Sequence, residues 1–383
     1  MNRFVIVVIA FDRPASLGRL LAQLITSNYN NQEVDLVISI DKGPSQENLI
    51  KICENHDWVH GTLKIIAHEQ NLGLKKHVLK CGDLVADYDA IIMLEDDIFP
   101  STSFFSFTEK AIRLSSGHEN IAGISLYTPS INEFTSKKFI PIFSTSDLFL
   151  AQVPQSWGQV WSKNMWFSFR EWLSNTSLDC SIDDRMPLGA RCWSDKSWKK
   201  LFFHYMVVMD KYFIYPSVSL STNFYEVGTH VKRKSTLFQV PLSVTETCHD
   251  LALPGTQFIY DSHYENNYLQ AFLQQRYVQK VVVDLYGSKE IELNVLLLTT
   301  RRLPYKIVYS YGLELKPHEL NVLWNVEGNL IYLYDTSKKS NVPAYSLSDE
   351  VKLIKYYELN DWRSSLKIVI NDLYFSLRSK LKL

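Results

Sequence analysis

Several patterns that would assign this chain to a common class of protein are missing from its sequence. The 383 residues include five cysteines, an odd number with no CxxC pair, which argues against a disulfide framework and a structural zinc site. No stretch approaches the roughly 20 consecutive apolar residues of a membrane-spanning helix. The first strands are followed by neither GxGxxG nor GxxxxGK with Ser or Thr, so neither a dinucleotide fingerprint nor a P-loop fits. The formal net charge of −1 gives nucleic acid no overall attraction.

The same absences bear on where the protein works. A chain without a disulfide framework suits a reducing compartment, and residues 5–10 are too short an apolar run for a signal sequence. We therefore expect a cytoplasmic protein. Residues 361–383 combine helical apolar spacing with five Lys and Arg residues, which leaves two interpretations open. The segment is either a helix in peripheral contact with the inner face of an anionic membrane or a packed terminal helix with solvated lysines.

Regular alternation of strand and helix patterns organises the first part of the chain. This alternation predicts an α/β fold, with a mostly parallel, Rossmann-like sheet flanked by helices. Later, short Val, Ile, Leu and Tyr runs separated by turns predict a β-rich C-terminal region. We divide the chain into a catalytic domain at 1–235, a connecting segment at 236–280 and a β-rich region with a terminal helix at 281–383. The expected early strands are 4–10, 34–41, 63–67 and 91–94, and the helices between them are 15–26, 46–55 and 75–85.

Three consecutive carboxylates, Glu95, Asp96 and Asp97, end the apolar run at 91–94. In an open parallel sheet, ligands bind outside the carboxyl ends of the strands. Clustered acids repel one another unless a cation lies between them, and hard oxygen ligands suit Mg²⁺ or Mn²⁺. We interpret the triplet as a metal site that holds a phosphorylated ligand. The simpler interpretation is an acidic turn in which Asp97 caps a helix that starts near Ser101.

Two other strand ends also carry polar residues. Asp12 and Arg13 follow the first strand, and Asp41 ends the second. These residues should line the same crevice as the triplet, because the carboxyl ends of parallel strands meet at one edge of the sheet.

Taken in order, these motifs resemble those of the GT-A glycosyltransferases. The early matches are Asp12-Arg13-Pro14, Ser39-Ile40-Asp41, Asn71-Leu72-Gly73 and Glu95-Asp96-Asp97. Later matches look like bacterial family 2 enzymes and the N-acetylglucosaminyltransferase I family: Trp157-Gly158, Trp193-Ser194-Asp195, and the segment from Asn223 to Gly228-Thr229-His230. The resemblance covers about the first 235 residues, and Ser194 departs from the acid often found at its position. Independently of the resemblance, Ser194 is the predicted N-cap of a helix that runs through Met209.

The resemblance implies a UDP-sugar donor, Mn²⁺ or Mg²⁺, and transfer with inversion. It also implies a role for each matching residue. Asp97 is the direct metal ligand, and His230 is a second ligand. Glu95 and Asp96 contact ribose and donor sugar, Asp41 lies near the uracil and Arg13 at the nucleotide end, and the Asn71 loop and Trp157 lie at the donor. Asp195 is the general base, with Asp183 and Asp184 as alternatives for that role.

Several of these residues also have a simpler interpretation. Asp195 is a first-turn acid favoured by a helix dipole, and Asp41 satisfies the turn at Gly43. Arg13 pairs with Asp12 or Asp41, and Trp157 belongs to the core. His230, in turn, is a surface histidine of a loop.

The function that we infer from the resemblance is an inverting, metal-dependent transferase. It moves a hexose or N-acetylhexosamine from UDP to a glycan or lipid-linked acceptor, in cell-surface polysaccharide biosynthesis. One alternative is a retaining transferase or a nucleotidyltransferase on a similar sheet, and the retaining enzyme would not need Asp195 as a base. The other alternative is a non-catalytic protein that binds sugar through its C-terminal region.

Overall fold

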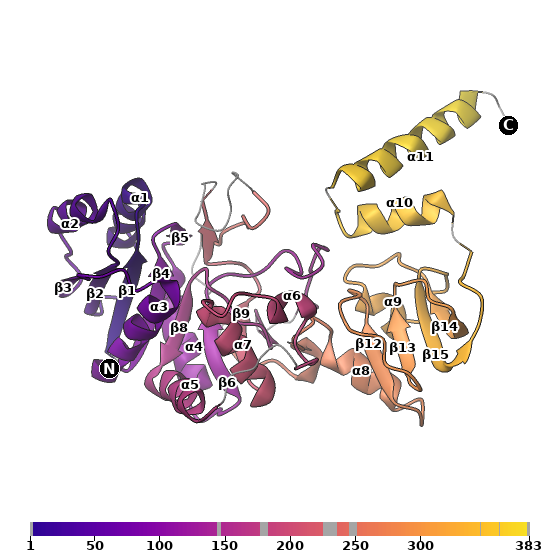
Figure 1. The fold of residues 1–383 in the computed structure, drawn as a ribbon, viewed down its shortest axis with the longest axis horizontal. Helices are drawn as coiled ribbons and strands as arrows, with labels where there is room; N and C mark the ends of the chain where they lie inside the picture. The colour runs from indigo at the N-terminus through magenta and orange to yellow at the C-terminus, as the bar shows by residue number, and fades with distance from the viewer. Residues whose placement is uncertain are drawn as a thin grey trace. The chain divides into compact units, whose positions relative to one another are not determined.

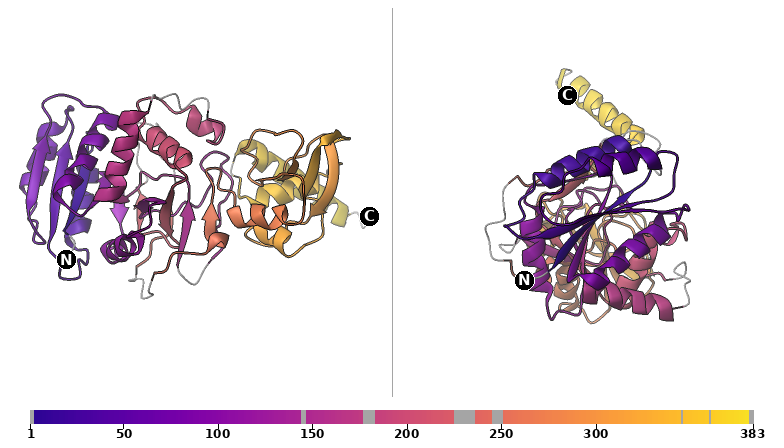
Figure 2. Two further views of the ribbon diagram at one scale, coloured as in Figure 1. Left: turned by 90° about the horizontal axis from the view of Figure 1, so that it is seen from below. Right: turned by 90° about the vertical axis from the view of Figure 1, so that its left-hand side faces the viewer.

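A computed structural model describes residues 3–143, 147–176, 183–224, 236–244, 251–344, 346–359 and 361–380. The chain forms two compact units (Figures 1 and 2). The first unit comprises Met1–Pro129 and Phe143–Phe258, and the second comprises Ser130–Ile142 and Ile259–Leu383. A short stretch near residue 130 therefore belongs to the unit formed by the C-terminal residues. Among the described residues, none of the helices has the length and apolar character needed to cross a membrane.

The first unit is built on one large sheet flanked by helices (Figure 2). Its strands are β1 (Phe4–Ala10), β2 (Val34–Ile40), β3 (Leu63–Ala67), β4 (Ala90–Glu95), β5 (Ile98–Pro100), β6 (Ile121–Ser125), β7 (Leu148–Ala151), β8 (Gln159–Ser162), β9 (Tyr212–Pro216) and β10 (Ser221–Asn223). Its helices are α1 (Pro14–Ile25), α2 (Gln46–Glu54), α3 (Leu74–Asp83), α4 (Phe104–Ser115), α5 (Lys163–Asn175), α6 (Leu188–Arg191) and α7 (Trp198–Val208), with short 3-10 turns η1 (Leu84–Asp87) and η2 (Thr256–Phe258).

Within this unit the strand order is β7-β9-β6-β8-β4-β1-β2-β3. Strand β1 pairs in parallel with β2 on one side and β4 on the other, and every residue of β1 and β2 is buried. Continuous apolar runs are typical of parallel strands covered on both faces, so the predicted α/β class is confirmed. Strand β8 was not predicted, and it pairs antiparallel with both β4 and β6.

The second unit contains a smaller sheet, so the predicted β-rich C-terminal region is confirmed. Its strands are β11 (Ile259–Tyr260), β12 (Val281–Asp284), β13 (Leu296–Thr299), β14 (Tyr305–Tyr311) and β15 (Ile331–Lys339), and the sheet has the order β12-β13-β15-β14. Its helices are α8 (Asn267–Gln274), α9 (Glu319–Leu323), α10 (Leu347–Tyr356) and α11 (Trp362–Lys380). The sequence pattern indicated the terminal helix α11 but neither α9 nor α10.

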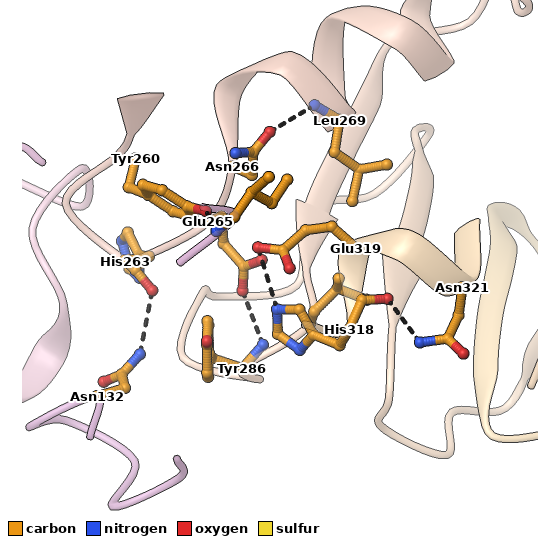
Figure 3. A network of polar contacts seen from close by, with 12 residues as sticks. Asn132, Tyr260, His263, Glu265, Asn266, Leu269, Tyr286, His318, Glu319 and Asn321 are labelled. Carbon is orange, nitrogen blue, oxygen red and sulfur yellow. Dashed lines mark hydrogen bonds and ion pairs between the residues drawn. The ribbon is translucent and has the colours of Figure 1, made fainter. Parts of the chain in front are cut away.

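Buried polar contacts hold Ser130–Ile142 in the second unit. The Asn132 side chain donates to the carbonyl oxygen of His263 at 3.2 Å (Figure 3), and Lys137 Nζ donates to that of Tyr286 at 2.8 Å. Phe139 is buried and meets the ring of Tyr264 edge-on, with centroids 5.0 Å apart. The segment thus supplies both an apolar side chain and a cation to this interior.

Two glutamates lie in the same interior (Figure 3). Glu265 accepts a hydrogen bond from the backbone N–H of Tyr286 at 2.7 Å, and burial raises its pKa well above the ordinary value. Glu319 Oε1 lies 3.6 Å from Nε2 of His318, whose Nδ1 is 2.8 Å from the hydroxyl of Tyr357. Burying such groups is expensive unless they are paired, so this unit depends on its polar partners as well as on apolar packing.

Two histidines share one serine beneath the carboxyl end of β2. Ser39 Oγ lies 2.8 Å from His77 Nε2 and 3.1 Å from His68 Nε2. His77 is buried, and burial lowers its pKa from 6.5 to about 4. The folded protein therefore holds this ring in its neutral form near neutral pH.

We expect the free energy of unfolding to fall as the pH is lowered from about 6.5 to about 4. In this range the unfolded chain protonates His77 and the folded chain does not, and the pKa difference corresponds to about 3 kcal/mol. Urea unfolding followed by tryptophan fluorescence at pH 7 and pH 4.5 measures the effect. His77→Gln should lose this part of the pH dependence, whereas the exposed His118→Gln should keep it. Identical pH profiles for wild type and His77→Gln would contradict the assignment.

Candidate active site

The acidic triplet lies where β4 ends, beside the loop that follows β1. Asp96 is buried, and its Oδ2 accepts a hydrogen bond from the backbone N–H of Phe11 at 2.8 Å. Arg13 Nη2 lies 2.6 Å from Asp96 Oδ1, and the same guanidinium pairs with Asp97. The Asp97 side chain keeps 23% of its surface exposed, so it is the aspartate of the triplet that reaches solvent.

One guanidinium faces three carboxylates here, so positive charge is in deficit. Burial raises the pKa of Asp96 to about 7, and burial together with the charge of Asp97 raises the pKa of Glu95 to about 8. Within the described ranges, no three His, Cys, Asp or Glu side chains form a ready-made metal site. An Mg²⁺-type ion needs only one or two carboxylates when phosphate oxygens and water complete its shell. The residue types and the charge deficit therefore fit such an ion at Asp97.

The chain passes the triplet again before residue 225. Strand β5 pairs antiparallel with β10, and the Phe224 N–H donates to the carbonyl oxygen of Asp97 at 3.3 Å. His230, the second expected metal ligand, lies outside the described residues. Asp96 and Asp97 do form a turn, between β4 and β5, but Asp97 does not cap the next helix, because α4 begins at Phe104 with Ser103 as its N-cap.

Asp41 fixes the neighbouring loop after β2. Its Oδ1 accepts from the N–H groups of Lys42 at 2.9 Å and Leu72 at 2.8 Å, and its Oδ2 accepts from Gly73 at 3.0 Å. Asn71 Nδ2 donates to the carbonyl oxygen of Lys42 at 2.8 Å. Asp41 and Asn71 therefore join two loops at the predicted edge, and their contact with a nucleotide stays a prediction.

Gly43 permits close packing between the first two strand-end loops. A Cβ atom at this position would lie 2.7 Å from the ring of Phe11 and 3.2 Å from Asp12 Oδ1. Asp12 Oδ1 also accepts from the N–H of Ser45 at 2.7 Å. The loops that carry Arg13 and Asp41 are thus packed against one another, as the strand-end argument predicted.

Trp157 lies half-buried among aromatic rings. Its centroid is 4.7 Å from that of Tyr127 and 4.8 Å from that of Phe238. The next residue, Gly158, has a φ of +95°, and a Cβ there would meet Ser221 Oγ at 3.1 Å. The positive φ and the close approach both require glycine. Trp157 therefore packs against aromatic neighbours but keeps part of its surface exposed, and Lys199 Nζ lies 5.8 Å from its ring centroid.

Asp195 lies just before α7 with a carboxylate that is 97% exposed. Lys200 Nζ is 3.1 Å from its Oδ1, and Lys75 Nζ donates to its carbonyl oxygen at 2.9 Å. Lys75 belongs to α3, whose N-cap Gly73 is held by Asp41. The structure thus links the Asp195 segment to the loop of Asp41. The predicted N-cap Ser194 is wrong, because Ser197 Oγ caps α7 by accepting from Lys200 N–H.

Lys199 is the residue that the sequence did not single out. Its Nζ lies 5.0 Å from the ring centroid of Trp193, and its charge lowers the pKa of Glu95 against the larger effect of burial. It brings the first turn of α7 into electrostatic contact with the triplet. The side chains of consecutive helical residues such as Lys199 and Lys200 point in different directions. The sequence alone did not show which of the two lysines acts on the triplet.

The reserve acids have different surroundings. Asp183 pairs with Arg185, and its Oδ2 lies 3.2 Å from His204 Nε2, whereas Asp184 is exposed. The arginine holds the pKa of Asp183 below its usual value. A carboxylate whose pKa is lowered in this way is a weak proton acceptor, so Asp183 is a poor candidate for the base.

No family model and no curated protein matches this sequence. Among solved structures, residues 1-349 of S. aureus TarS in complex with UDP-GlcNAc match with 11% identity over 60% of each chain and a TM-score of 0.38. Mannosyltransferase PcManGT from Pyrobaculum calidifontis in complex with GDP-Man and Mn²⁺ matches with 10% identity over 57% of each chain and a TM-score of 0.34. GalNAc-T7 with UDP, GalNAc and Mn²⁺ matches with 10% identity over 62% of this chain and 46% of its own, at 0.41.

The matches thus span at most 60% of those three solved chains. Their TM-scores are all below 0.5, so these likenesses carry no conclusion about activity.

Asp41→Ala should lower the free energy of unfolding by about 2–3 kcal/mol, because three backbone N–H groups lose a charged acceptor. Chemical unfolding followed by tryptophan fluorescence measures the loss. The exposed Asp57→Ala is the matched control and should stay within about 0.5 kcal/mol of wild type. Equal stability of the two variants would show that the Asp41 contacts do not hold the loops.

Proposed function

We propose that the chain is a GT-A-type glycosyltransferase that uses a nucleotide-sugar donor and a divalent cation. The observation that carries this proposal is the charge-deficient triplet at the end of β4, packed against the loops that follow β1 and β2. A sugar diphosphate brings negative charge of its own, and a divalent cation at Asp97 would balance both sets of oxygens. The donor is a UDP-sugar and the group transferred is a hexose or an N-acetylhexosamine.

The exposure of each side chain indicates its role in binding the donor and the ion. Asp97 reaches solvent and would hold the ion, with His230 as its second ligand. Buried Asp96 orients Arg13 at the nucleotide end, and Asp41 with Asn71 shapes the base and ribose contacts through the loop that they hold. Glu95, on which the charge of Lys199 acts, would position the donor sugar near Trp157. A bound ion would supply neutralisation of the charge that develops on the leaving diphosphate.

Transfer with inversion needs a base that takes the proton of the acceptor hydroxyl. Asp195 has an exposed carboxylate, and Lys200 Nζ lies 3.1 Å from its Oδ1. In this role it removes the acceptor proton while the bond from the sugar to the diphosphate breaks, and no covalent intermediate on the protein is required. The acceptor is a glycan or a lipid-linked saccharide, and the pathway is cell-surface polysaccharide assembly.

UDP together with Mn²⁺ should raise the melting temperature of the protein. A ligand at a hundred times its Kd stabilises the folded state by about 2.7 kcal/mol. A thermal-shift screen of UDP, GDP and UDP-sugars with and without Mn²⁺ measures this, and Asp97→Ala should remove the metal-dependent part. The exposed Asp184→Ala is the matched control. No stabilisation by any of these nucleotides at saturating concentrations would overturn the donor site.

Asp195→Asn should lower turnover by about 10²–10⁴-fold and leave the UDP–Mn²⁺ melting shift unchanged, because the base acts on the acceptor and not on the donor. Water can replace the acceptor, so hydrolysis of the best UDP-sugar supplies the assay. Asp184→Asn should keep full activity. Proton NMR of the sugar first released reads the stereochemistry, and an inverted anomer is expected. A retained anomer, or an active Asp195→Asn, would favour the retaining alternative.

A further inference from the structure

Helix α11 buries its polar side and exposes its apolar side. Ser364 and Asn371, seven residues apart, are buried, and Asn371 lines a groove of about 430 Å³ together with residues of α10. Figure 1 shows α10 and α11 lying together. An ion pair between Lys367 and Glu350 and a 3.5 Å contact between Lys355 and Asp372 also join these helices. A soluble helix ordinarily turns its apolar stripe inward, so this arrangement needs an explanation.

The exposed side carries a continuous apolar stripe. Its members recur at intervals of four and seven residues, which places them on one face of a helix. Their exposed fractions run from 48% for Ile370 to 71% for Trp362. The stripe comprises Trp362, Leu366, Val369, Ile370, Leu373 and Tyr374.

The charges of α11 indicate what covers this stripe. The helix sequence contains Arg363, Lys367, Arg378 and Lys380 against a single acid, Asp372. Two copies of α11 meeting face to face would bring these positive charges together, whereas anionic headgroups would neutralise them. Tryptophan and tyrosine, both present in the stripe, favour the boundary between hydrocarbon and water.

We propose that α11 lies flat on an anionic lipid bilayer, with its apolar stripe in the interface and its basic residues at the headgroups. Leu366 and Leu373 enter the acyl boundary, while Trp362 and Tyr374 sit at headgroup level. Lys355 and Lys367 add little to lipid attraction because Asp372 and Glu350 lie beside them. The association is peripheral and salt-dependent. It does not rest on the proposed glycosyl transfer, because it concerns a different part of the chain.

Co-sedimentation with vesicles tests the proposal on the full chain without nucleotide. Vesicles of phosphatidylcholine with phosphatidylglycerol should bind the protein at least about tenfold more strongly than phosphatidylcholine alone, and 0.5 M NaCl should weaken binding. Leu366→Ser combined with Leu373→Ser should lower the partition coefficient by at least about tenfold. These side chains are exposed, so the melting temperature and the circular dichroism of the double variant should match wild type.

A pair of tryptophans gives a matched control within the second unit. Trp362 is 71% exposed and Trp324 is 66% exposed, but only Trp362 belongs to the stripe. Trp362→Ala should weaken vesicle binding, and Trp324→Ala should not. Equal effects of the two substitutions, or unchanged binding of the double variant, would overturn the proposal. The proposal would also be overturned if the wild-type protein does not bind anionic vesicles but forms a dimer in sedimentation velocity, and if Leu366→Ser combined with Leu373→Ser abolishes that dimer.

Discussion

Unbalanced negative charge at the end of β4 is the constraint on which the first unit depends. Three carboxylates meet one guanidinium, and Arg13 reaches two of them only because the loop after β1 lies against the triplet. That loop in turn packs on the turn at Gly43, and Asp41 ties the second loop to the third. The buried strands β1, β2 and β4 hold all three loops in register. The buried apolar sheet thus holds the loops in place, although the carboxylates that they bring together repel one another.

Much of this arrangement could be predicted from the sequence, for an identifiable reason. An apolar run that ends in acids indicates both a buried strand and the sheet edge at which the strand ends. Arg13 and the triplet were therefore expected in one crevice, and in the structure they lie together. Strand β8 escaped prediction because four residues between Gly158 and a helix carry too little periodicity. The N-cap of α7 was misplaced because Ser194 and Ser197 are both competent caps, and only the backbone at Ser197 decides between them.

The role of Lys199 shows a different limit. Its charge acts on Glu95 from the first turn of α7 to the end of β4, and no local pattern encodes such a long-range electrostatic interaction. The interior of the second unit has the same property. Glu265 and Lys137 are far apart in the chain, and each looks like a surface residue in its own segment. Only the folded arrangement shows that Glu265 is buried and Lys137 partly buried beside Tyr286, whose N–H donates to Glu265 and whose carbonyl oxygen accepts from Lys137.

The short stretch Ser130–Ile142 has a consequence for how this protein was assembled and how it can be divided. The chain passes between the two units at 129–130, at 142–143 and at 258–259, so neither unit is a single continuous segment. A cut at 142–143 or at 258–259 separates Phe139 from its aromatic neighbours Tyr260 and Tyr264, and a cut at 129–130 separates the two parts of the first unit. The two units therefore cannot be exchanged as simple cassettes, by recombination in evolution or by fusion in the laboratory. Each must be inherited with a piece of sequence that lies within the boundaries of the other.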